Sequence, residues 1–428
     1  MLNVGSSIVA ILFNFWGVNP AELPSIPVIA WQDTAIFQVP TEPDPQVEIL
    51  IDQYLDRLGE KQIPRDRQGV WIQSEWAILG DRRSQTRVPA ASLTKVATTL
   101  ASLHHWGPSH VFQSEVLHTG FINDGVLQGD LVIHSGGDPL FVWEDAIALG
   151  KALQDLGIQT IAGDIVIVGP WYMNFEGEDP ERAAEFLAQG LNQARWGPAL
   201  RRQFAKLNPQ PQAPEIELQG TVQLQAVLPP DTQQLLRLRS LPVAMILQQM
   251  NLYSNNNLSH ILADGVGGAK QVEAIAESQA NISPEQINLI NGSGLGRENQ
   301  MTPQAAVKLF QAIEIYLEDN GSELTVWDLF PVGGWDSIGT MQFRGIPNGT
   351  ANKTGTLNRM SALAGVFPTE ERGLVWFALQ NDDGNILEFR AAQDWLLTQL
   401  AEHWSFEDAP GERVEPVFGD PNRIVWLQ

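Results

Sequence analysis

The spacing of apolar residues predicts a helix at the start of the folded region. From Val47 onward, apolar side chains recur every three or four positions until Leu58, and Gly59 follows, where a helix can end. The Ala-, Leu- and Thr-rich residues 90–103 predict a second helix, which the Trp-Gly-Pro sequence at 106–108 should close. Further helices are predicted at 146–156, 241–253, 303–317 and 387–404.

Short runs of β-branched and aromatic residues between turn residues predict strands. They lie at 70–72, 76–79, 126–127, 131–133, 161–168, 363–367 and 374–379. The last two runs are separated by the polar residues 369–373, so we expect them to be consecutive strands joined by a turn. The order helix, strands, turn, strands, helix predicts an α/β (α+β) protein whose antiparallel sheet is covered by helices.

Proline content and the alternation of elements suggest the domain boundaries. Residues 40–45 contain three prolines, which disfavour a helix or a central strand and predict a linker. Residues 107–239 contain strands and helices of their own, which predicts a smaller α/β domain inserted into the chain. The main domain is then formed by residues 46–106 and 240–428, and residues 1–45 precede it.

The beginning of the chain contains an apolar run at residues 8–13, which resembles part of a secretion signal. The run is too short to cross a bilayer as a helix of about 20 residues. The basic segment of a signal is missing, because the first Lys or Arg is Arg57. We expect an exported, for example periplasmic, protein without a stable transmembrane anchor, mainly because of the chemistry that the motifs described below imply.

Charge and cysteine content exclude several kinds of function. The chain has 26 Lys plus Arg against 50 Asp plus Glu, a net charge of −24, which would repel a phosphate backbone and argues against nucleic acid as a partner. The absence of cysteine excludes disulfides, a thiol nucleophile and thiolate metal sites. The histidines at 104, 105 and 110 lack the spacing of a His-Glu-x-x-His site, so neither a metal nor another cofactor is expected.

Ser92-Leu93-Thr94-Lys95, at the start of the predicted helix 90–103, is the chain's only Ser-x-x-Lys. A spacing of three places both side chains on one helix face, where Lys95 can take a proton from Ser92. The partial positive charge of a helix N-terminus would favour the developing alkoxide.

Two other short motifs also occur once each. Ser254-Asn255-Asn256 is the only Ser-x-Asn and follows the predicted helix 241–253. Lys353-Thr354-Gly355-Thr356 contains the only Lys-Thr-Gly and precedes the predicted strand 363–367. Ser-x-x-Lys, Ser-x-Asn and Lys-Thr-Gly in this order resemble the signature set of the penicillin-recognising serine enzymes.

From about residue 71 to residue 395, the chain is similar to the class C low-molecular-mass penicillin-binding proteins, the DacB-type D-alanyl-D-alanine carboxypeptidases and endopeptidases. Supporting stretches are residues 89–92, 125–131, 136–139, 291–295 and 329–334. The resemblance implies a penicillin-binding, transpeptidase-like catalytic domain with an extra domain between the first two motifs. It also implies peptidoglycan stem peptides as substrates and covalent inhibition by β-lactams.

The resemblance further implies a role for each motif. Ser92 would be the nucleophile and Lys95 its base, Ser254 would relay a proton to the leaving amine, and Asn256 would orient Lys95 and the peptide amide. Lys353, Thr354, Gly355 and Thr356 would bind the substrate's terminal carboxylate, and the backbone N–H groups of Ser92 and Thr356 would form the oxyanion hole. As a base, Lys95 needs a pKa about three units below 10.4, which burial and the charge of Lys353 would supply.

Two residues depart from the family pattern. Asn291 stands where an Asp is usual, and His260 where a Glu is usual. Neither carries the acyl chemistry, so these departures concern substrate detail rather than reaction type. The inserted region is also shorter than in the fullest members of the family.

Two alternatives use the same site. A β-lactamase or esterase would need fast deacylation, but the nearest match to a Glu-x-x-Leu-Asn motif, residues 277–281, has Ala280 in place of the Leu. A non-catalytic module that binds peptidoglycan peptides is disfavoured because all three motifs are intact. The sequence does not decide between exo- and endopeptidase activity, nor which residue occupies the third position of the stem peptide.

Overall fold

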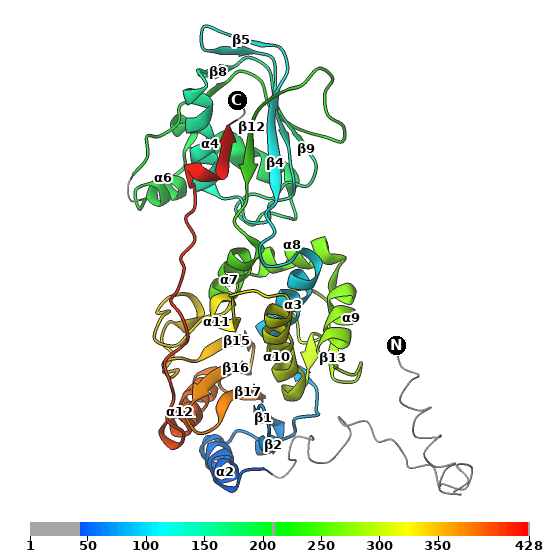
Figure 1. Cartoon of the computed structure of the whole chain (residues 1–428), viewed down its shortest axis with the longest axis vertical. Helices are drawn as coiled ribbons and strands as arrows, with labels where there is room; N and C mark the ends of the chain where they lie inside the picture. The colour runs from blue at the N-terminus through cyan, green and yellow to red at the C-terminus, as the bar shows by residue number, and fades with distance from the viewer. Residues whose placement is uncertain (1–42, 208–209, 427–428) are drawn as a thin grey trace, which may run out of the picture. The chain divides into compact units, whose positions relative to one another are not determined.

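The computed structural model describes residues 43–207 and 210–426 of the chain (Figure 1). Its largest antiparallel sheet has the strand order β15-β16-β17-β1-β2. The strands are β1 (Gln68–Ser74), β2 (Ile78–Arg82), β15 (Ala351–Leu357), β16 (Met360–Thr369) and β17 (Gly373–Asp382). The expected consecutive strands near the C-terminus are β16 and β17, in which Phe367 pairs with Val375. The predicted fold class, an antiparallel sheet covered by helices, is confirmed.

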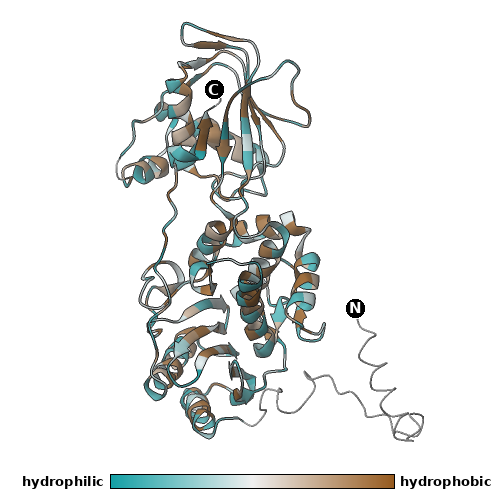
Figure 2. Cartoon of the chain, in the orientation of Figure 1, coloured by the Kyte–Doolittle hydropathy of each residue, from teal (hydrophilic) through white to brown (hydrophobic). Residues whose placement is uncertain are grey.

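Both faces of this sheet are buried, because neighbouring residues of each strand point to opposite sides. In β17, Phe377 packs with α2 (Pro45–Glu60) and α12 (Ile386–His403). The next residue, Ala378, packs on the other side with α3 (Thr94–Trp106) and α10 (Pro303–Asp319). Figure 2 shows the apolar residues along α3 and α10. This two-sided burial explains why β16 reads as a continuous apolar run rather than an alternating one.

The remaining helices of the catalytic region surround the motifs. They are α7 (Val243–Tyr253), α8 (Asn256–Val266), α9 (Ala269–Gln279) and α11 (Val326–Leu329). Helix α3 ends where the sequence predicted, because Gly107 adopts a φ of 82°, a left-handed conformation that favours glycine. Helix α2 begins at Pro45, inside the predicted linker, because Asp44 caps it and proline is tolerated in the first turn.

Residues 107–239 supply most of a second sheet with the order β11-β9-β7-β4-β12-β18. Its strands are β4 (Gln113–His118), β7 (Leu131–His134), β9 (Ile165–Val168), β11 (Val222–Gln225), β12 (Gln233–Arg239) and β18 (Ile424–Trp426). Helices α4 (Trp143–Asp155) and α5 (Pro180–Gly190) pack on it through a separate apolar core. A smaller sheet joins β10 (Glu217–Leu218), β8 (Thr160–Ile161), β6 (Val126–Gln128) and β5 (Phe121–Asn123).

The assignment of all residues 240–428 to the main domain is wrong at its end. Strand β18 pairs antiparallel with β12, with Leu238 opposite Ile424, so the end of the chain completes the sheet of the inserted region. Arg423 next to it forms an ion pair with the buried Asp145 of α4. The run Ile-Val-Trp is too short for its sequence to show which sheet it joins. Its pairing depends on the free edge of strand β12, which is far away in the sequence.

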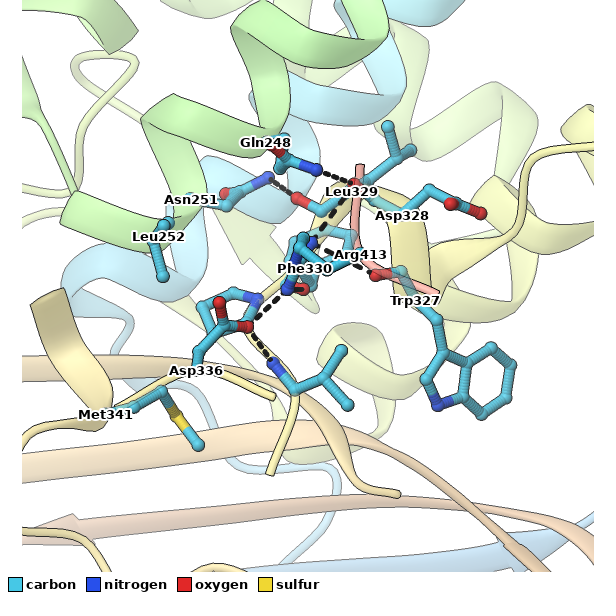
Figure 3. Close-up of polar contacts among 12 residues, drawn as sticks. Gln248, Asn251, Leu252, Trp327, Asp328, Leu329, Phe330, Asp336, Met341 and Arg413 are labelled. Carbon is cyan, nitrogen blue, oxygen red and sulfur yellow. Dashed lines mark hydrogen bonds and ion pairs between the residues drawn. The ribbon is translucent and has the colours of Figure 1, made fainter. Parts of the chain in front are cut away.

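A buried ion pair fixes the segment that follows α11 (Figure 3). Arg413 pairs with Asp336, and the two side chains are 9% and 4% exposed. The Arg413 guanidinium also donates to the carbonyl oxygen of Phe330 at 2.9 Å, and Asp336 accepts from the N–H of Val332 at 2.7 Å. Each charge therefore has hydrogen-bond partners besides its counter-ion, as buried charges require.

Asn251 connects this segment to the helices of the catalytic region. Its side-chain amide donates to the carbonyl oxygen of Leu329 at 3.1 Å (Figure 3). The same amide also donates to the hydroxyl of Thr99 at 3.0 Å. Thr99 lies on α3, one turn beyond Lys95, and Asn251 lies near the end of α7. This contact holds the end of α7, where the Ser-x-Asn motif begins, against the helix that carries Lys95.

The apolar run at residues 8–13, taken above as signal-like, lies outside the described residues. Among the residues that the structure describes, no helix combines the length and the apolar character needed to cross a membrane. In the same residues, no cluster of three His, Asp or Glu side chains is arranged to hold a metal ion.

Candidate active site

Ser92 lies in a short turn, not in the first turn of a continuous helix from residue 90 as predicted. Residues Ala91–Leu93 form a 3-10 turn, and α3 begins only at Thr94. Ala91 has a φ of 47°, an uncommon value for a residue with a side chain. Gly294 lies directly against it, and a Cβ atom there would be 1.7 Å from the carbonyl oxygen of Ala91. The backbone before Ser92 is thus held in an unusual conformation by a neighbour that has to be glycine.

Lys95 is completely buried, and its amine contacts each part of the site. Its Nζ atom lies 3.1 Å from Ser92 Oγ and donates to Asn256 Oδ1 at 2.8 Å. It also donates to the carbonyl oxygen of Ser293 at 2.8 Å. Three partners at these distances leave the amine little freedom, so it remains directed at Ser92.

The Ser-x-Asn motif forms the junction between α7 and α8. Ser254 ends α7 in a left-handed conformation with a φ of 50°, and Asn255 caps α8 by accepting the N–H of Leu258 at 3.0 Å. Asn256 is the first residue of α8 and reaches Lys95 from there. The tight junction explains why Ser254 and Asn256 point into one site although they belong to different helices.

Lys353-Thr354-Gly355-Thr356 precedes the predicted strand 363–367, which is part of β16, but it also lies inside a strand that was not predicted, the edge strand β15. Lys353 is completely buried, and its Nζ atom lies 3.1 Å from Ser254 Oγ. At Gly355, an added Cβ would be 3.2 Å from the backbone nitrogen of Ser92, so glycine lets the strand approach the nucleophile closely. Thr356, the next residue, is exposed.

Both buried lysines of the site have lowered pKa values. For Lys95, burial lowers the pKa to about 7. Burial and, second, the positive charge of Lys95 lower the pKa of Lys353 well below its usual range. We expected the charge of Lys353 to lower the pKa of Lys95, but burial is what lowers the pKa of Lys95, and the repulsion between the two amines lowers the pKa of Lys353. Lys95 can therefore be neutral near pH 7 and accept a proton from Ser92.

This pKa predicts the pH dependence of acylation. The neutral fraction of Lys95 grows as the pH rises through 7, so the acylation rate should increase about tenfold from pH 6 to pH 8 and then level off. A lysine with an ordinary pKa would give a rate that keeps rising beyond pH 9. Stopped-flow acylation by a chromogenic β-lactam at constant ionic strength measures this profile, and a rate still rising steeply at pH 9 would contradict the assignment of the base.

A family model shows where the chain belongs. The model of the D-Ala-D-Ala carboxypeptidase 3 (S13) family matches residues 51–180 and 204–400, which is well over half of the chain. The chain belongs to the S13 peptidase family. The resemblance to DacB-type enzymes is thereby confirmed.

Individual relatives of this S13 chain are distant. It is 23% identical over 393 residues to the D-alanyl-D-alanine carboxypeptidase DacB of Haemophilus influenzae. This match covers 69% of the present chain and 80% of DacB. A predatory peptidoglycan endopeptidase from Bdellovibrio bacteriovorus has a similar fold, with a TM-score of 0.71 and 20% identity over 84% of this chain and 98% of that one. Penicillin-binding protein 4 of H. influenzae gives a TM-score of 0.60 at 19% identity, over 82% and 98% of the two chains.

The two departures of this S13 chain from the family pattern meet at Ser293. Asn291 Oδ1 accepts from the hydroxyl of Ser293 at 3.2 Å, and His260 Nε2 lies 2.6 Å from the same hydroxyl. Asn291 also donates to the carbonyl oxygen of Leu295 at 2.7 Å, which an aspartate could not do. Both residues thus support the turn whose carbonyl group holds Lys95. Burial, and second the charge of Lys95, lower the pKa of His260.

Sequence reasoning missed two residues that contact the motifs. Ser293 was noted only as part of the Asn-Gly-Ser-Gly stretch, although its carbonyl oxygen binds Lys95. Arg390 was not considered, yet its Nη2 atom donates to Thr356 Oγ1 at 2.9 Å. No local motif marks a backbone carbonyl group or an arginine within a helix. Their positions follow from how the turn at 291–295 and helix α12 pack against the site.

Proposed function

We propose that this chain is a serine-type D-Ala-D-Ala carboxypeptidase/endopeptidase that cleaves peptidoglycan stem peptides through an acyl-enzyme. The observation that carries the proposal is the buried amine of Lys95, 3.1 Å from Ser92 Oγ, with its pKa lowered to about 7. A buried lysine without a carboxylate partner costs stability, which favours a catalytic over a structural role. Labelling with a β-lactam, followed by mass spectrometry of the modified peptide, tests the proposal.

In the first step, neutral Lys95 accepts the hydroxyl proton of Ser92 while Ser92 Oγ attacks the carbonyl carbon of the penultimate D-alanine. The negative charge that develops on the carbonyl oxygen would be stabilised by the backbone N–H groups of Ser92 and Thr356. The close approach of Gly355 to the Ser92 nitrogen supports this assignment, because it brings β15 and the nucleophile turn together.

The C–N bond then breaks, and the leaving amine takes the proton that Lys95 accepted from Ser92, which returns Lys95 to its neutral form. Ser254 lies 3.1 Å from the amine of Lys353 and is the proposed relay for that proton. Asn256 holds Lys95 through its side-chain oxygen, which leaves its amide N–H₂ group available to the peptide. Water then attacks the ester carbonyl and regenerates Ser92, with Lys95 again able to accept a proton.

The substrate's terminal carboxylate would bind at Lys353, Thr354 and Thr356. The pKa of Lys353 is lowered in the empty site, and an arriving carboxylate would favour its protonated form because opposite charges attract. The same pocket would accept the carboxylate of a β-lactam. Two relatives support this expectation, since structures exist of the Bdellovibrio endopeptidase acylated by penicillin G and of H. influenzae penicillin-binding protein 4 complexed with a β-lactam.

The lifetime of the β-lactam adduct separates this proposal from a β-lactamase on the same fold. A peptidase of this type keeps the adduct for minutes or longer, whereas a β-lactamase releases it within one fast turnover. No adduct on a well-folded sample would favour the non-catalytic peptide-binding module.

The proposed substrate class also supports action outside the cytoplasm, where peptidoglycan is found.

Replacing Lys353 by methionine should harm peptides that end in a free carboxylate more than their amidated counterparts. Loss of a charge-assisted hydrogen bond should lower kcat/KM for the carboxylate peptide about tenfold or more. Methionine keeps the volume of this fully buried side chain, and Lys308→Met, at a partly buried lysine that donates to the carbonyl oxygen of Asn281, serves as the control. Equal losses on both peptides would show instead that Lys353 acts by tuning Lys95.

A further inference from the structure

Helix α12 places an arginine against the last residue of the Lys-Thr-Gly-Thr motif. Arg390 is half-buried, and its Nη2 atom donates to Thr356 Oγ1 at 2.9 Å. This donation occupies a lone pair of the hydroxyl oxygen and leaves the hydroxyl hydrogen to be donated elsewhere. Thr356 is exposed, so that hydrogen can be offered to a bound molecule.

Within residues 43–207 and 210–426, Arg390 forms no ion pair with a carboxylate. The nearby Asp394 accepts three hydrogen bonds from Arg344, at 2.6, 3.0 and 3.2 Å, so its carboxylate is the partner of Arg344. Arg390 Nε is buried and lacks a hydrogen-bond partner among the residues that the structure describes. Burial and, second, the charge of Arg344 lower the pKa of Arg390. An anion placed near Thr356 would relieve this imbalance.

A fixed charge at this position complements Lys353. The amine of Lys353 is buried and has a lowered pKa, so its charge depends on what occupies the site. A guanidinium keeps its proton at any pH at which the protein is folded, and its planar fork of donors matches a carboxylate. Arg390 can therefore attract an anion before Lys353 has gained its proton.

We propose that Arg390 is a specificity-determining positioning residue, which orients the Thr356 hydroxyl and completes an anion pocket for the carboxylate at the end of the substrate. The inference rests on the proposed function and adds a residue to the same site. It predicts a preference for substrates with a free C-terminal carboxylate that disappears, at least in part, when Arg390 is changed. A purely structural link between α12 and β15 predicts equal effects on all substrates.

The test compares an acyl-D-Ala-D-Ala peptide with its C-terminal amide on R390Q. We expect kcat/KM to fall about tenfold for the carboxylate, mainly through a higher KM, and less than about threefold for the amide. The matched control is R359Q, which removes an equal charge from the turn after β15, where Arg359 pairs with the exposed Asp383. R359Q should change kcat/KM for either peptide by less than about twofold.

Equal losses of R390Q on both peptides, or no loss, would overturn the inference while leaving the proposed function intact. A wild-type protein that cleaves neither peptide and forms no β-lactam adduct would instead refute the proposed function. If R390Q loses its cooperative melting transition, the same ratio is measured on R390K, which keeps the charge but lacks the planar fork. R390K should reduce the preference for the carboxylate about threefold or more, and an unchanged preference overturns the inference.

Discussion

Replacing Ser92 by alanine should abolish covalent labelling by a β-lactam and cleavage of D-Ala-D-Ala peptides. Among the residues that the structure describes, no other hydroxyl is hydrogen-bonded to the Lys95 amine, so we expect the acylation rate to fall by at least about 10³-fold, as when a nucleophile is removed. The free energy of unfolding should change by less than about 1 kcal/mol, because the removed hydroxyl is only partly buried. Intact-protein mass spectrometry and thermal melting provide the two measurements.

Ser278→Ala is the matched control, because Ser278 is an exposed serine whose hydroxyl donates only to the carbonyl oxygen of Ile275 in its own helix. It should label like the wild-type protein. Peptide mapping of the wild-type adduct should identify the peptide that contains Ser92. An adduct on a different residue, or one that persists in Ser92→Ala, would show that the nucleophile is elsewhere.

The three motifs could be recognised from the sequence because each is a short run whose residue types the chemistry requires. In the structure Lys95 is hydrogen-bonded to Ser92 and to Asn256, and Lys353 is hydrogen-bonded to Ser254. The period of apolar residues also predicted helices α2, α3, α7, α10 and α12 and strands β16 and β17, since burial sets that period. Local patterns are informative where the interacting residues are close in the sequence.

Contacts between distant segments could not be predicted in this way. The left-handed conformation of Ala91 depends on Gly294, about two hundred positions later, and only the folded backbone shows that they touch. The placement of Lys-Thr-Gly inside β15 was missed because Lys353 and the two threonines do not form an apolar run. The pairing of β18 with β12 likewise joins segments almost two hundred residues apart.

Burial of Lys95 links activity to a cost in stability. With the pKa lowered to about 7, the folded protein binds this proton less tightly than the unfolded chain does. Between pH 7 and about 10.5 the unfolded chain holds the proton that the folded protein has lost, so this group contributes a stability that rises with pH over that range. Below pH 7 Lys95 is protonated in both states, and the full cost of burying its charge lowers the free energy of unfolding. A residue kept at such a cost is expected to serve the reaction rather than the fold.

Lys95→Arg should therefore abolish acylation although it keeps the positive charge. A guanidinium with a pKa above about 12 cannot accept the proton of Ser92 near neutral pH. We expect the acylation rate to fall at least about 10²-fold, the lower range for removal of a general base. The rise in rate through pH 7 should disappear with it. If Lys95 were only a cation near a helix end, arginine would be tolerated, because it is an equally good helix former.

Lys308→Arg is the control for the size of the new side chain, because Lys308 is partly buried and donates to the carbonyl oxygen of Asn281 away from the site. It should acylate normally. Lys95→Met separates chemistry from packing: it should lose acylation as fully as Lys95→Arg but melt no lower than the wild-type protein, since no amine is buried. A folded Lys95→Arg protein that acylates at close to the wild-type rate would refute the Ser-Lys mechanism, even if Ser92 remained the labelled residue.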